Sequence, residues 1–141
     1  MKAIKKHENY ITFNIDEIGQ ETLNSLIGKA LKLCDTISVS EELAYYAKPM
    51  YKTQIPYNSG FIQDRFVYYN TTGVSEYIVQ EMEQPRSFHA FFCVYTCLDF
   101  YDKRDLVLSV NIVEGIVTVD STRIDLSKYG YWEGEPTNEN E

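Results

Sequence analysis

The run FHAFFCVYTCLDFY, from Phe88 to Tyr101, is the longest β-forming segment of the chain. Aromatic, β-branched and small apolar residues dominate it, which is typical of a strand. Its alternation places Phe88, Ala90 and Phe92 on one face, and Phe91 and Cys93 on the other. Both faces are apolar. We therefore expect a central strand that is covered on both sides.

The residues after this run continue the β pattern. Asp102 to Asp105 read as a charged turn, and Leu106 to Val113 alternate as a second strand. Glu114-Gly115 fits a two-residue hairpin connection, and Ile116 to Val119 return as a third strand. Residues 122–126 extend that strand or add another. Together, residues 88–126 predict an antiparallel meander.

The N-terminal part predicts one strand and the main helix. Tyr10 to Ile15 are rich in β-formers. Over residues 20–34, apolar side chains recur at the spacing of one helical face. Gly28 inside this helix suggests close packing on the sheet. The predicted fold class is α+β: a mostly antiparallel sheet with this amphipathic helix on one face.

The middle of the chain is less regular. Ser38 to Glu41 resemble a capping box for a short helix over residues 42–47, which Pro49 would end. Residues 50–60 read as a loop and Phe61 to Tyr69 as a strand. Val74 to Met82 read as the paired strand or as a helical turn, and a strand is favoured. That loop, the aromatic C-terminal stretch or a second subunit could cover the second face of the central strand.

Composition predicts one globular domain, residues 1–132, followed by an acidic tail, residues 133–141. The chain has a net charge of −8. Without the tail, 17 acidic and 13 basic residues remain, so half of the excess charge lies in nine residues. There is no apolar run long enough to span a membrane, no signal peptide pattern and no disulfide framework among three cysteines. We expect a cytoplasmic protein without membrane contact.

No motif for catalysis, metal binding or a cofactor is visible, so we expect no enzyme, no metal and no cofactor. Cys93 and Cys97 lack a second ligand pair, and buried thiols explain them more simply than a metal site. His89 could act as a general base beside Asp99, Tyr95 or Cys93, but a structural histidine is favoured. Asp99, Asp102 and Asp105 read as a solvated turn.

The 12 tyrosines combined with acidity favour protein binding. Two segments join aromatic and acidic residues, and they give the predicted partner-binding residues: Glu41, Glu42, Tyr45, Tyr46, Asp102, Tyr131, Trp132 and Glu133. A basic protein, such as a toxin or a defence nuclease, is the expected partner. Direct nucleic-acid binding is not expected because the chain is acidic. A homodimer is possible.

In size, charge and lack of an active-site motif, the chain resembles small acidic bacterial inhibitors. These include toxin-immunity proteins and phage-encoded anti-defence antagonists of the anti-CRISPR type. The resemblance implies stoichiometric inhibition and assigns no residue. The alternative is a binding protein for a small anionic ligand, such as a signalling nucleotide. It would use aromatic rings with Arg65, Arg86, Arg104 and Arg123, the four arginines of the chain.

Overall fold

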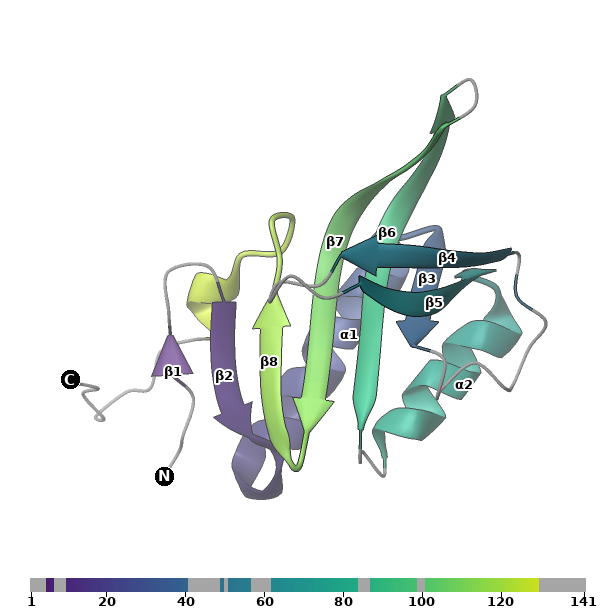
Figure 1. Ribbon diagram of the computed structural model, residues 1–141. Coiled ribbons are helices and arrows are strands. Elements are labelled where there is room, and N and C mark those ends of the chain that lie inside the picture. Colours follow the sequence, from purple (N-terminus) through teal and green to yellow (C-terminus); the bar gives the residue numbers. More distant parts are fainter. Residues whose placement is uncertain are drawn as a thin grey trace.

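The computed structural model describes residues 5–6, 10–40, 49, 51–56, 62–83, 87–98 and 101–129. In this part of the chain, eight strands form one sheet in the order β1-β2-β8-β7-β6-β3-β5-β4 (Figure 1). Every neighbouring pair is antiparallel. The strands are β1 (Lys5–Lys6), β2 (Tyr10–Asn14), β3 (Thr36–Ser40), β4 (Tyr51–Pro56), β5 (Ile62–Tyr69), β6 (Phe88–Leu98), β7 (Tyr101–Val113) and β8 (Ile116–Asp120). The helices are the short π-helix η1 (Ile15–Gly19), α1 (Gln20–Leu33), α2 (Thr72–Met82) and the 3-10 helix η3 (Leu126–Lys128). The predicted α+β class is confirmed.

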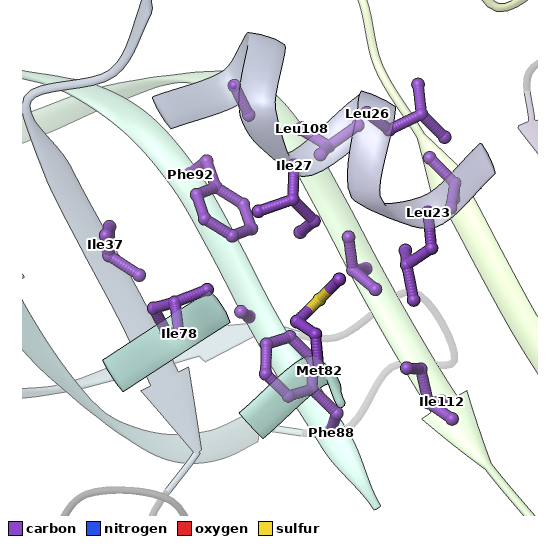
Figure 2. Close-up of a cluster of buried hydrophobic side chains, with 14 of the residues drawn as sticks. Leu23, Leu26, Ile27, Ile37, Ile78, Met82, Phe88, Phe92, Leu108 and Ile112 are labelled. Carbon is purple, nitrogen blue, oxygen red and sulfur yellow. The ribbon is translucent and has the colours of Figure 1, made fainter. Parts of the chain in front are cut away.

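Helix α1 confirms the main helix of the sequence prediction. Leu23, Leu26, Ile27 and Ala30 recur on one face and are buried. Figure 2 shows Leu23, Leu26 and Ile27 directed toward the sheet, where Phe92 of β6 and Leu108 of β7 lie. The helix covers the far side of β6 and β7 in Figure 1. Burial of this apolar face is what holds the helix on the sheet.

The predicted meander is confirmed over β6, β7 and β8. Glu114 and Gly115 connect β7 to β8 with φ of 52° and 83°, the left-handed pair that a tight hairpin turn requires. Two details of the prediction were wrong. Residues 122–126 form bends and the start of η3 instead of a strand, and residues 102–105 lie inside β7 instead of a turn. A charged segment remains in a strand there because β8 pairs with β7 only over residues 109–113, so the side of β7 at residues 102–105 is a local edge.

Three predictions for the middle of the chain were also wrong. Val74 to Met82 belong to helix α2, whose buried residues Val74, Tyr77, Ile78 and Met82 follow helical spacing. Residues 51–56 of the predicted loop form the edge strand β4, which tolerates Pro56 at its end. The capping box is absent, since Ser38 and Ser40 lie in β3. Residues 42–47, the short helix that it was expected to begin, lie outside the described residues.

Strand β6 is central, as predicted, with β7 on one side and β3 on the other. The sheet curls, so that β5 and β4 cross in front of β6 and β7 while α1 lies behind (Figure 1). Arg65 of β5 contacts the Phe91 ring of β6 inside this curl, with 4.2 Å between Cζ and the ring centroid. The second apolar face of β6 is therefore covered in part by the sheet itself.

Candidate functional site

Most of the predicted partner-binding residues cannot be placed. Seven of them lie outside the described residues: Glu41, Glu42, Tyr45, Tyr46, Tyr131, Trp132 and Glu133. The eighth, Asp102, lies in β7 opposite Cys97 of β6. The grouping of these residues into one surface therefore stays a prediction.

Asp102 belongs to a projecting two-stranded arm. We define the arm as residues 94–98 of β6 and residues 101–105 of β7, which extend beyond the rest of the sheet at the top of Figure 1. Pairing of β3 with β6 ends at Cys93, and pairing of β8 with β7 ends at Ser109. After β8, the chain stays beside β7 because two side-chain hydroxyls donate hydrogen bonds to β7 carbonyls. Ser121 Oγ donates to the Val107 carbonyl at 2.6 Å and Thr122 Oγ1 to the Leu106 carbonyl at 3.3 Å.

A second surface is the sheet face opposite α1 on strands β2, β8 and β7. Here the alternation that buries Ile11, Val117, Val119 and Val110 turns the intervening side chains to the other side. We call this surface the open face, because no described helix or strand lies over β8 and β2 there (Figure 1). Its residues are Tyr10, Thr12, Asn14, Ser109, Asn111, Val113, Ile116, Thr118 and Asp120.

The open face offers hydrogen-bond acceptors and exposed apolar area. The acceptors within reach of a partner include Asp120 and Thr118, whereas Asn111 Oδ1 is buried and has no hydrogen-bond partner among the described residues. Burial raises the pKa of Asp120, against a smaller lowering by the Ser121 backbone N–H. Tyr10 and Ile116 expose 40% and 44% of their surface, large fractions for such residues. None of the nine residues is basic. The face suits a ligand that brings N–H donors and positive charge.

Arg65 lies at the bend of the curl and serves the fold. Its side chain is 0% exposed. Nη2 donates to the carbonyls of Ser38 at 3.0 Å and His89 at 2.8 Å, and Nε donates to Ser38 Oγ at 3.1 Å. Its guanidinium thus connects β5, β3 and β6. Because these donors are bound to protein groups, Arg65 is poorly placed to bind a nucleotide.

The remaining arginines lend little further support to an anionic ligand site. Arg123 pairs with Asp105, with 3.4 Å between Nη2 and Oδ2. Arg86 and the side chain of Arg104 lie outside the described residues. A hollow of about 700 Å³ lies on the outer face of α2, and Glu76 and Glu83 are among the described residues that line it. Their charges would repel an anion. The ligand hypothesis stays a prediction.

Cys34, Cys93 and His89 are candidate nucleophiles or bases among the described residues. Cys34 and Cys93 are buried free thiols, in line with the simpler interpretation for Cys93. Burial, with smaller effects of Cys93 and Asp35, raises the pKa of Cys34 to about 12, so it stays protonated and unreactive. His89 Nε2 lies 3.3 Å from Ser87 Oγ. The side chains of Tyr95, Cys97 and Asp99 are outside the described residues.

The described part of the chain holds no group of three His, Cys, Asp or Glu side chains placed to bind a metal ion. It also contains no helix long and apolar enough to cross a membrane.

Tyr129 marks where the described chain ends, at the start of the aromatic segment that leads to the tail. Its hydroxyl lies 3.4 Å from Ser25 Oγ, and Lys29 Nζ lies 5.7 Å from the ring centroid. Burial alone would raise the pKa of Tyr129. Hydrogen bonds with Ser25 and Lys29 and the charges of Lys29 and Lys128 outweigh it, so the pKa is lowered. The segment therefore begins on the outer side of α1, away from the open face.

The sequence interpretation missed the open face, although its signal was present. Ser109 and Asn111 alternate with Leu108, Val110 and Ile112, which is the pattern of a strand with one polar side. Only the pairing of β7 with β8 and of β8 with β2 shows that these polar positions continue across strands. Comparison with known proteins found no matching family, no similar curated protein and no similar solved structure.

Proposed function

We propose that this protein is a stoichiometric inhibitor that docks on a basic protein through the open face. The observation that carries the proposal is the composition of that face. It combines a partly buried carboxylate at Asp120 with exposed apolar area at Tyr10 and Ile116, and none of its nine residues is basic. The expected target class is a nuclease toxin or a nucleic-acid-handling defence enzyme, because such proteins present basic surfaces to bind nucleic acid.

Charge and contact area have different roles in this proposal. The net charge of −8 would accelerate the encounter with a basic surface and exclude nucleic acid from the protein. The lifetime of the complex would come from contacts that exclude water, with Tyr10 as an aromatic anchor. Asp120 is partly buried, so a positively charged group of the target can pair with it at the interface. A cation brought beside it would replace the solvent that burial has removed and lower its pKa again.

The experiment compares two charge reversals on opposite sides of the sheet. Asp120→Lys changes the open face, and Glu21→Lys changes the exposed side of α1. Both alter the net charge equally, so a difference between them reports the location of the contact. Tagged wild-type protein and both variants would capture partners from a lysate of the native host. We expect a basic protein to bind the wild type and Glu21→Lys, and to be lost with Asp120→Lys.

The captured protein must then behave as an inhibited target. We expect its activity to be titrated to zero at one equivalent of this chain. The association rate should fall steeply between low and physiological salt, because steering is screened. Equal capture by Asp120→Lys and the wild type would exclude the open face as the docking surface. A captured protein whose activity is unchanged would exclude inhibition.

A further inference from the structure

The two edges of the arm have opposite chemical character. The β7 edge is Tyr101-Asp-Lys-Arg-Asp105, with charged residues at every position after the tyrosine. The β6 edge is Val94-Tyr-Thr-Cys-Leu98, which has no charge, no proline and no glycine. Charged residues protect a strand edge from pairing, whereas an apolar β-forming edge invites it. One edge of the arm is therefore protected and the other is not.

Backbone geometry shows which groups the β6 edge presents. The Asp35 N–H donates to the Cys93 carbonyl at 3.0 Å, so the backbone groups of Cys93 point toward β3. Backbone groups alternate in direction along a strand, so those of Tyr95 and Cys97 point to the same side. Pairing with β3 ends at Cys93, and no described strand continues it along residues 94–98. The N–H and C=O groups of Tyr95 and Cys97 thus form the unprotected edge.

We propose that this edge pairs with the same edge of a second copy of the chain, antiparallel about a two-fold axis at Thr96. In this register Thr96 lies opposite its own copy, Val94 opposite Leu98, and Tyr95 opposite Cys97. Tyr95 and Cys97 exchange backbone hydrogen bonds across the axis, because their groups point outward. The two arms become one ribbon with a charged β7 strand at each outer edge.

Self-complementarity is the reason for choosing a second copy as the partner. In a two-fold interface, a residue close to the axis lies near its own copy in the partner. A charged residue there would therefore meet a like charge. Residues 94–98 contain none, although the chain as a whole is strongly acidic. A two-stranded ribbon alone is marginally stable in water, and pairing of arms removes that weakness. The proposal uses residues of the arm alone and is independent of the open face.

Two proline variants test which edge is used. Tyr95 pairs with Arg104, and both N–H groups point away from the arm on opposite edges. Proline at either position spares the hydrogen bonds inside the arm. Light scattering during size-exclusion chromatography should give the wild type and Arg104→Pro twice the chain mass of 16.4 kDa. Tyr95→Pro should elute at the monomer mass. A wild type that is monomeric at all concentrations, or a Tyr95→Pro dimer, would overturn the proposal.

A crosslink tests the register without risk to the fold. Opposed residues that share no backbone hydrogen bond have Cα atoms roughly 4.5 Å apart, within the range for a disulfide. In a Cys97→Ser background, oxidised glutathione should convert two Thr96→Cys chains into a disulfide-linked dimer. The two protein thiols are oxidised to one disulfide, and the oxidised glutathione is reduced to two molecules of glutathione. Val94→Cys should not, because the two copies of residue 94 would lie far apart along the ribbon. Crosslinking at residue 94 and not at residue 96 would disprove the two-fold axis at Thr96.

Discussion

Arg65 shows how a single buried charge can join strands that are distant in the sequence. Its planar guanidinium contacts two carbonyls, a hydroxyl and an aromatic ring at the same time. A lysine has one compact ammonium group and cannot reproduce this fork. We expect Arg65→Lys to lower the free energy of unfolding by about 3 kcal/mol, since buried acceptors lose their partners. Urea denaturation measures the change.

The matched control for this prediction is Ser38→Ala. It removes the hydroxyl that Arg65 Nε contacts and leaves both carbonyl contacts in place. We expect a smaller loss of about 1 kcal/mol. If Arg65→Lys cost no more than Ser38→Ala, the guanidinium would not be the connection between these strands.

Cys34 makes the stability of the protein sensitive to alkaline pH. Its pKa is raised from 9.0 to about 12 in the folded state. Above pH 9 the unfolded chain releases the thiol proton while the folded chain keeps it, so the free energy of unfolding falls as pH rises toward 12. Below pH 9 this contribution is constant. Chemical denaturation across this pH range, compared with Cys34→Ala, should show a steeper decline for the wild type. Parallel curves would contradict the burial of the thiol.

Gly28 of α1 and Gly19, the last residue of η1, are expected to respond in opposite ways to the same substitution. A Cβ on Gly28 would meet no atom within 4 Å, so close packing does not require this glycine. A Cβ on Gly19 would lie 2.7 Å from Phe13 Cε2 and closer still to Cδ2 of that buried ring. We expect Gly28→Ala to stabilise the protein by roughly 0.5–1 kcal/mol, and Gly19→Ala to destabilise it by about 1–3 kcal/mol. Thermal unfolding of both variants should show shifts of opposite sign.

Elements with a strong local pattern could be predicted from the sequence. The apolar face of α1 and the turn at Gly115 are fixed by neighbouring residues. Helix α2 was mistaken for a strand because Val74, Tyr77 and Ile78 favour β structure, although their spacing is helical. Strand β4 has no local pattern of its own, and it exists through pairing with β5. For α2, the prediction gave more weight to the β-forming composition than to the helical spacing. For β4, pairing with β5 determines the strand, and the local sequence does not.

The candidate site depends on register, which the sequence does not display. A polar residue on a strand is ordinarily solvated, and nothing local distinguishes Asn111 or Asp120 from other such residues. Their significance comes from the pairing of Asn111 with Thr118 and of Asp120 with Tyr10, which joins separate strands into one face. The burial of Arg65 likewise follows from the curl of the sheet. The segments that combine acidic and aromatic residues were recognisable in the sequence. The alternating polar residues of β7 and β8, in contrast, have the pattern of ordinary solvent-exposed strand residues.

For the whole molecule, we expect stability to decrease from the centre of the sheet to the tip of the arm. The lower part of β6 has a strand on each side and α1 behind it, whereas the arm has only two strands. Amide hydrogen exchange should therefore be slowest at residues 88–93 and faster at residues 94–98, because local opening is easier where fewer contacts are lost. Protein concentration should alter this gradient in amide exchange rate along β6. In a dimer the Tyr95 and Cys97 amides become protected, while the Thr96 amide is already bonded to β7 in the monomer. Residue-resolved exchange at low and high protein concentration measures both effects, and uniform protection that is independent of concentration would contradict pairing through the arm.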